Sequence, residues 1–107
     1  MSRIPLQLNS RPTLAERFGR NLWRCRRRTG LSQEDLGNLV GLSRDAISRL
    51  EKGERLARLD TIVRLAVGTN VSTCVLLEGM EWRPGQYVDG DFYVEHPAAS
   101  LRRSVRR

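Results

Sequence analysis

Histidine, cysteine and long apolar runs are all scarce in this chain of 107 residues. There is one histidine, His96, and it stands beside a proline without a Ser, Cys or carboxylate arrangement around it. Nucleophilic catalysis needs such a partner, and nucleotide chemistry commonly needs a glycine-rich phosphate loop, which is also missing. We therefore expect no enzyme activity and no cofactor.

The two cysteines, Cys25 and Cys74, are far apart and have no CxxC or Cys/His spacing. Zinc sites normally show such spacing, so we expect no metal. Both cysteines fall on apolar positions of predicted helices. This placement predicts two buried, reduced thiols rather than a disulfide.

No apolar stretch approaches the roughly 18 residues that a membrane span requires. The N-terminus also lacks the apolar core of a signal peptide. Hydrophobic residues make up 39% of the chain and charged residues 29%, which is ordinary for a globular domain. The sequence thus predicts a cytoplasmic protein with no membrane partner.

Positive charge is what the chain has in excess. Nineteen basic residues face twelve acidic ones, giving a net charge of +7, and Lys52 is the only lysine. The planar guanidinium of arginine suits phosphates and guanine edges better than the point charge of lysine does. The balance predicts a polyanionic partner.

Residues 33–52 carry the most informative pattern, which predicts two short amphipathic helices joined by a tight turn. Gly41 suits the positive φ of the first residue past a helix end. Ser43 is then placed to accept a hydrogen bond from the backbone N–H of Ala46 as an N-cap. Apolar residues recur at helical spacing on both sides of this turn, namely Leu36, Leu39, Val40, Ile47 and Leu50.

Cap signals set the boundaries of the remaining helices. A capping box at Thr13 and Glu16 starts the first helix, which ends at Gly30, and Ser32 with Asp35 starts the second. Arginines crowd the last turns of the first helix and predict a mostly solvated face, namely Arg24, Arg27 and Arg28. The inward stripe of the first helix is predicted to be Leu14, Phe18, Leu22 and Cys25. The apolar positions of the fourth helix are Leu59, Ile62, Val63, Leu65 and Ala66, and those of the fifth are Val75, Leu76 and Leu77. The fifth helix is expected to expose enough apolar surface to suggest a partner.

Three segments follow from these boundaries. Residues 1–12 read as a flexible basic arm and 13–79 as the helical domain, followed by an extension over 80–107. In the extension, aromatic and β-branched residues on both sides of Asp89-Gly90 predict a hairpin over 86–95. A disordered basic tail over 97–107 would end the chain.

The central pattern resembles the helix-turn-helix of the lambda-repressor-like family, which includes Cro, phage repressors and Xre-type regulators. The residues that carry the resemblance are Gln33, Gly37, Gly41, Ile47, Glu51 and Gly53. It implies an all-α fold, a five-helix domain followed here by a short C-terminal β-hairpin or extended tail. It also implies a sequence-specific transcriptional regulator, a repressor, that binds double-stranded operator DNA. Gly37 departs from the usual Ala, and Arg44 and Asp45 stand where many relatives carry Gln or Thr.

The resemblance assigns roles to residues of the third helix, 43–52. That helix would enter the major groove, and because Ile47 and Leu50 point inward, the expected base readers are Arg44, Asp45, Ser48 and Arg49. The arginines can present a fork to guanine, whereas Asp45 can either accept from cytosine or hold one arginine in place. Both roles of Asp45 stay open. The expected phosphate contacts are Gln33, Ser43, Lys52 and Arg55.

The resemblance also implies a partly buried ion pair between Arg26 and Glu51. This pair would attach the first helix to the helix-turn-helix of residues 33–52. One reading helix covers about half a turn of DNA, so we expect a homodimer on half-sites roughly 34 Å apart. The fifth helix and the extension are the predicted contact between its two copies.

Two other functions remain open. In one, the chain is the antitoxin of a toxin–antitoxin pair and binds both its operon DNA and a protein partner through the aromatic segment 82–94. In the other, it is an adaptor that has lost DNA binding, although the outward Arg44 and Arg49 and the basic surplus argue against this.

Overall fold

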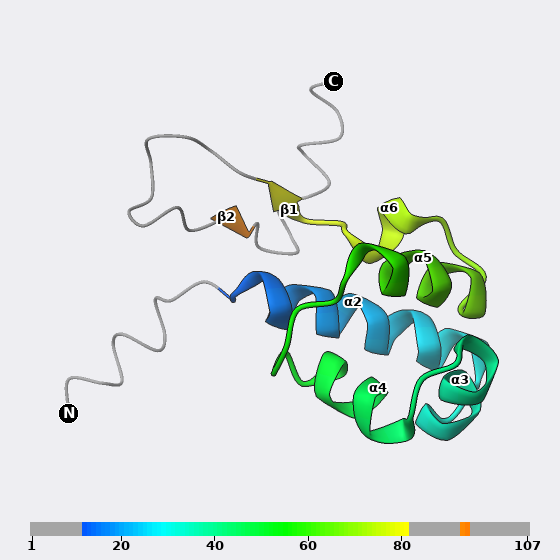
Figure 1. Cartoon of the computed structure of the whole chain (residues 1–107). Helices are drawn as coiled ribbons and strands as arrows, with labels where there is room; N and C mark the ends of the chain where they lie inside the picture. The colour runs from blue at the N-terminus through cyan, green and yellow to red at the C-terminus, as the bar shows by residue number, and fades with distance from the viewer. Residues whose placement is uncertain (1–11, 82–92, 95–107) are drawn as a thin grey trace.

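The computed structural model describes residues 12–81 and 93–94, and five helices make up most of this part of the chain (Figure 1). They are α2 (Leu14–Thr29), α3 (Gln33–Val40), α4 (Arg44–Glu51), α5 (Leu59–Gly68) and α6 (Thr73–Leu76). Helix α2 runs between α4 on one side and α6 on the other. The predicted all-α, five-helix class is confirmed. Within the described residues no helix is both long and apolar enough to cross a membrane.

The caps that the sequence predicted define the helix ends. Thr13 and Glu16 form a reciprocal capping box at the start of α2, and Ser32 and Asp35 form another at the start of α3. Helix α2 ends at Gly30 with φ 78° and α3 at Gly41 with φ 77°. These side-chain and glycine caps satisfy backbone groups that the helices cannot satisfy themselves. Local chemistry therefore fixes where α2 and α3 begin and end.

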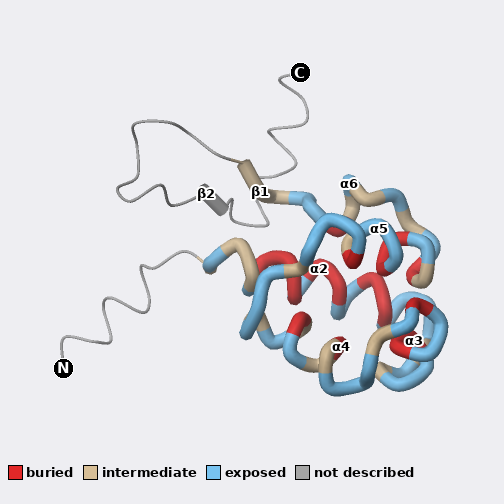
Figure 2. Tube along the Cα trace, viewed as in Figure 1, coloured by how far each residue is buried: buried red, intermediate tan, exposed pale blue. Residues whose placement is uncertain are grey.

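The core lies where the four shorter helices meet around α2 (Figure 2). Helix α3 approaches α5 closely at Gly68. A Cβ at this position would come within 3 Å of side-chain atoms of Leu36 and Val40. Ten apolar residues are buried: Phe18, Leu22, Cys25, Leu36, Val40, Ile47, Leu50, Leu65, Ala66 and Leu76. All five helices therefore contribute to one core.

Five apolar positions that the sequence placed on helices are exposed, including Leu77 just after α6. Leu39 is 65% exposed, because Leu36 and Val40 already occupy the contact of α3 with α5. Leu59 and Val63 on α5 also face outward, and Leu65 and Ala66 make the contact in their place. Cys74 is exposed because α6 is a single turn whose buried residue is Leu76, on the opposite side of that turn. The prediction of two buried thiols holds for Cys25 only.

Side chains of α2 fix the start of the C-terminal extension. Asn21 Nδ2 donates to the carbonyl oxygens of Leu76 and Glu78 at 2.9 and 3.0 Å, and Arg17 Nε donates to that of Glu78 at 3.0 Å. Arg17 and Asn21 are 3% and 4% exposed. They satisfy carbonyls that the short α6 leaves unpaired at its end.

A short antiparallel strand pair follows these contacts. Strand β1 (Met80–Glu81) pairs with β2 (Tyr93–Val94), with Met80 opposite Val94 and Glu81 opposite Tyr93. Most of the predicted hairpin over 86–95 lies outside the described residues, as do the predicted tail over 97–107 and residues 1–11 of the predicted arm.

Gly19 marks the closest approach of α2 to α4. A Cβ at this position would collide with the backbone carbonyl oxygens of Leu50 and Glu51, in the last turn of α4. A backbone atom cannot move aside as the tip of a flexible side chain can. The separation of these two helices therefore depends on the missing side chain.

We expect Gly19→Ala to lower the free energy of unfolding by about 1–3 kcal/mol, the usual cost of overpacking. The sign is diagnostic, because Gly→Ala inside an unconstrained helix stabilises by about 1 kcal/mol. Urea denaturation measures the difference, with Arg24→Ala on the exposed face of the same helix as the control. A Gly19→Ala variant more stable than the parent would contradict the close approach.

Candidate nucleic-acid interface

Helices α3 and α4 form a two-helix unit whose second helix turns a polar face outward. Ile47 and Leu50 of α4 are 0% and 3% exposed, so they fix the inner face of the helix. Ser43 accepts a hydrogen bond from the Ala46 N–H at 3.0 Å and starts the helix. Among the predicted readers, Arg44, Asp45 and Arg49 are exposed and Ser48 is half-buried.

Asp45 and Arg49 form an ion pair along this outer face. Arg49 Nε lies 2.8 Å from Asp45 Oδ2, four residues earlier, and the side chains are 52% and 73% exposed. The hydrogen bond from Arg49 lowers the pKa of Asp45 below its ordinary value of 3.8, and the charges of Arg55 and Lys52 act in the same direction. The same hydrogen bond raises the pKa of Arg49. In the free protein, Asp45 therefore holds one of the two outward arginines.

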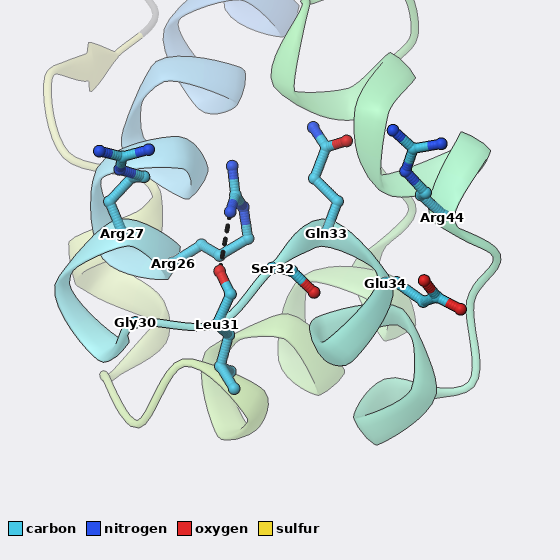
Figure 3. A pocket seen from close by; sticks show the side chains of 8 residues that line it. All are labelled: Arg26, Arg27, Gly30, Leu31, Ser32, Gln33, Glu34 and Arg44. Atoms are coloured by element: carbon cyan, nitrogen blue, oxygen red, sulfur yellow. Dashed lines mark hydrogen bonds between the residues drawn. The ribbon is translucent and has the colours of Figure 1, made fainter.

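A polar hollow of about 680 Å³ lies at the N-terminus of α3 (Figure 3). Gln33 and Arg44 lie beside each other there, and Arg27 reaches the hollow from the end of α2. The sequence pattern does not identify Arg27 as part of a site. Its position three residues before Gly30, in the last turn of α2, is the feature that could have indicated it. The residues that line the hollow are Arg26, Arg27, Gly30, Leu31, Ser32, Gln33, Glu34 and Arg44.

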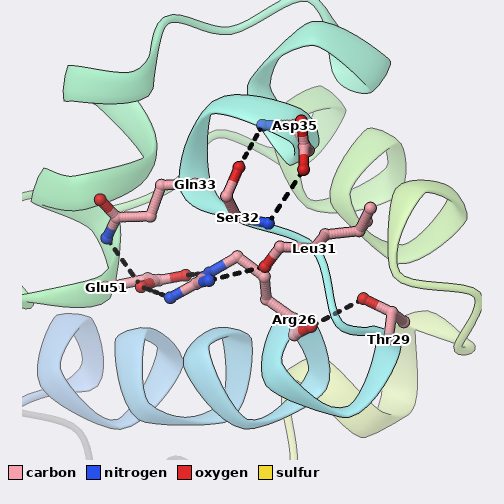
Figure 4. Close-up of polar contacts among 7 residues, drawn as sticks. All are labelled: Arg26, Thr29, Leu31, Ser32, Gln33, Asp35 and Glu51. Atoms are coloured by element: carbon pink, nitrogen blue, oxygen red, sulfur yellow. Dashed lines mark hydrogen bonds and ion pairs between the residues drawn. The ribbon is translucent and has the colours of Figure 1, made fainter.

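Arg26 and Glu51 form the expected ion pair, with Nε 2.6 Å from Oε2 and side chains only 9% and 4% exposed. Arg26 Nη2 donates to Oε1 at 3.0 Å, and Nη1 donates to the Leu31 carbonyl at 2.8 Å (Figure 4). Gln33 Nε2 also donates to Glu51 Oε1 at 3.0 Å. One carboxylate thus joins the end of α2, the start of α3 and the end of α4.

The four predicted phosphate contacts fall into two groups. Gln33 lies in the hollow at the start of α3, although its amide also supports Glu51. Ser43 stands at the start of α4. Lys52 and Arg55 are exposed beyond the end of α4. Hydrogen-bonding side chains therefore stand near the start of the outward-facing helix, and basic ones stand beyond its end.

Helix α5 exposes an apolar stripe formed by Leu59, Val63 and Val67, four residues apart and 77%, 47% and 78% exposed. Helix α6, where the sequence predicted a twofold contact, has only four residues, and Leu77 just after it is 40% exposed. Of these two helices, α5 therefore has the larger exposed apolar surface within the described part of the chain.

In residues 12–81 and 93–94, no group of three or more His, Cys, Asp or Glu side chains is placed to hold a metal ion. The segment that suggested an antitoxin, 82–94, lies almost wholly outside the described residues. What the described surface offers is a row of basic and hydrogen-bonding groups along α4 and beside the start of α3.

Residues 17–78 match the family model described as a helix-turn-helix domain. A curated relative, the SPbeta prophage-derived uncharacterized HTH-type transcriptional regulator YonR of Bacillus subtilis, is 34% identical over 62 residues. That alignment covers 58% of this chain and 57% of YonR, so the chain spans little more than half of that relative.

Solved structures give the same answer for the fold. The restriction-modification controller protein C.AhdI of Aeromonas hydrophila is 35% identical, with a TM-score of 0.57 over 58% of this chain and 94% of its own. The P22 c2 repressor, solved in complex with a synthetic operator, is 29% identical, with a TM-score of 0.55 over 58% and 94%. The likeness covers the helical body.

We expect Glu51→Ala to lower the free energy of unfolding by about 3–5 kcal/mol, because it leaves Arg26 charged, buried and unpaired. Replacing both partners, as Arg26→Met with Glu51→Leu, should recover much of this loss, since no uncompensated charge remains. Urea denaturation of the single and double variants measures both effects.

The exposed ion pair on α5 provides the control. Asp60 and Arg64 lie 3.7 Å apart with side chains 60% and 44% exposed, so Asp60→Ala should change stability little. A Glu51→Ala variant that unfolds at the same urea concentration as Asp60→Ala would show that the Arg26–Glu51 pair does not hold the helices together.

Proposed function

Because this chain belongs to the helix-turn-helix domain family, we propose that it is a cytoplasmic, sequence-specific transcriptional regulator, a repressor that binds double-stranded operator DNA as a homodimer. The observation that carries this proposal is the orientation of α4. Burial of Ile47 and Leu50 turns Arg44 and Arg49 outward on a helix short enough to lie in the major groove. The operator-bound P22 c2 repressor and the regulator YonR, both similar to this chain, support it.

The start of α3 would hold one phosphate of the DNA backbone. Ser32, Gln33 and Glu34 at this end line the hollow, and a helix N-terminus with its free backbone N–H groups and its dipole favours an anion. Arg27 and Arg44 on its rim add positive charge, and Gln33 adds an amide donor. Ser43 would contact a phosphate at the start of α4, and Lys52 and Arg55 phosphates beyond its end, which together set the position of the helix without reading sequence.

Base reading would fall to the outer face of α4. Arg44 and Arg49 can each donate two hydrogen bonds to guanine O6 and N7, and Ser48 can donate to or accept from either kind of base pair. Asp45 stands on the same face. In the free protein Asp45 Oδ2 lies 2.8 Å from Arg49 Nε. This contact is relevant to whether Asp45 accepts from a cytosine or holds an arginine in place.

The twofold contact would use the apolar stripe of α5, Leu59, Val63 and Val67. Three exposed aliphatic residues at four-residue spacing form a continuous ridge, which is the arrangement by which helices pack on each other. The predicted contact at α6 would lie beside this ridge, since α5 and α6 are in contact.

We expect the full chain to bind duplex DNA with an affinity that falls steeply as salt rises, because phosphate contacts release counterions. Selection from a random duplex pool should recover one preferred sequence. Arg44→Ala and Arg49→Ala should each relax the preference at particular base pairs, by about 1–3 kcal/mol.

Arg24→Ala is the matched control, because it removes an exposed arginine that lies on α2 and not on α4. It should lower affinity for all duplexes equally or leave it unchanged. Duplex binding that does not depend on salt, or a selection that recovers no preferred sequence, would refute the proposed function.

We expect Val63→Glu to abolish the dimer while leaving the fold intact, because the new charge enters the ridge of α5 but lies on the surface of the monomer. Sedimentation velocity measures the association. Leu39→Glu changes an exposed leucine on α3, outside the ridge, and should leave the dimer unaffected. A Val63→Glu protein that still sediments as a dimer would place the contact elsewhere.

A further inference from the structure

The two outward arginines of α4 differ in how they are held. Arg49 is held by Asp45, one helical turn earlier, through a hydrogen bond of 2.8 Å from Nε. Arg44 has no ion pair with any residue that the structure describes. Of the two candidate readers, Arg49 therefore has the side chain whose direction is set before DNA arrives.

The atom through which Arg49 is held decides what the rest of its guanidinium can do. Asp45 accepts from Nε, on the stem side of the group, and among the described residues neither Nη1 nor Nη2 makes a hydrogen bond. These two nitrogens form the tip of the fork. A guanine contact through O6 and N7 needs two parallel donors on one arginine, and Nη1 with Nη2 supplies them.

Charge argues against Asp45 as a base reader. Its carboxylate is bound to Arg49 and lies close enough to Arg55 and Lys52 for their charges to lower its pKa, so it stays ionised at neutral pH. Arg49 occupies Oδ2, so accepting from a cytosine N4 would require the other oxygen, Oδ1, and would bring the carboxylate deeper into a groove lined by phosphates. Holding Arg49 neutralises it instead, and restricts a long side chain that would otherwise lose rotamer freedom on binding.

We propose that Asp45 is a positioning residue that fixes Arg49 for end-on reading of one guanine, and that Asp45 itself reads no base. This inference deepens the proposed function and depends on it. It assigns guanine specificity to the pair of residues 45 and 49 rather than to two independent readers. The pair is built within one helix, so it is present in the monomer as well as in a dimer.

The test combines single-base-substituted duplexes with a double-mutant cycle in the full chain. Arg49→Ala identifies the base pair that Arg49 reads, where preference for guanine should fall by about 5- to 150-fold. Asp45→Ala should reduce preference at that same base pair, by about threefold or more, because Arg49 must then be ordered on binding. The double variant should lose no more than Arg49→Ala alone, because positioning has no effect once the reader is absent.

Two further variants separate positioning from general effects on the protein. Asp45→Asn keeps an oxygen that can accept from Nε, so it should retain more guanine preference than Asp45→Ala. Asp60→Ala breaks the corresponding i, i+4 pair on α5 and should leave every base preference unchanged. Thermal unfolding followed by circular dichroism checks that all variants fold.

A measurement without DNA tests the contact itself. In an NMR titration, the carboxyl pKa of Asp45 should lie below its ordinary range in the parent protein and move toward that range in Arg49→Ala. An Asp45 pKa that does not respond to the loss of Arg49 would overturn the inference, whatever the binding data show.

The outcomes distinguish this inference from the function on which it rests. If Asp45→Ala relaxes preference at a different base pair, additively with Arg49→Ala, then Asp45 is a reader and the inference is wrong while the function stands. If Arg49→Ala leaves every preference intact, Arg49 reads nothing and the inference fails again. A parent protein that selects no sequence refutes the proposed function directly, before any variant is compared.

Discussion

The arrangement of the two-helix unit, α3 and α4, relative to α2 depends on the buried ion pair between Arg26 and Glu51. Its carboxylate accepts from the guanidinium on α2 and from Gln33 on α3, while it ends α4. A charged pair this far from solvent contributes little net stability compared with an apolar pair, because both groups lose hydration. What it supplies is direction, since three helices can satisfy these hydrogen bonds in only one mutual arrangement.

Steric constraint and hydrogen bonding act at the same point of the fold. The absent side chain of Gly19 lets α2 approach the carbonyls of Leu50 and Glu51, and the ion pair joins the same Glu51 to Arg26, about two turns further along α2. An isolated helix of eight residues is not stable in water, so α4 is stabilised mainly by the packing of its buried residues, Ile47 and Leu50, in the core. The polar surface of α4 is therefore rigid because its inner side is fixed twice, by packing and by charge.

The two ion pairs described for α4 differ in burial and in what they connect. The pair of Glu51 with Arg26 is enclosed and links separate helices, whereas the pair of Asp45 with Arg49 is exposed and stays within one turn of one helix. The exposed pair adds little to stability. Its consequence is directional, because it occupies Nε of Arg49 and leaves the tip of the guanidinium facing solvent. The exposed ridge on α5, on a different helix, is the surface that we propose for a second copy.

The sequence by itself determined the helices of the reading unit, their caps and the inner face of α4, because these follow from local spacing and from capping side chains within four residues. It also identified the Arg26–Glu51 pair through the family resemblance. Only the tertiary structure decided which apolar residues are covered. Leu39, Leu59, Val63 and Cys74 lie at helical positions that are compatible with a core, yet they are exposed.

The physical reason is that a periodic pattern defines the apolar arc of a helix, whereas neighbouring helices decide which part of that arc is buried. The same reason explains why the positions of Gln33 and Arg27 were not predicted from the sequence. Their place in the network around Glu51 and at the rim of the hollow depends on α2, α3 and α4 meeting at one point, and no local pattern in the chain encodes that meeting.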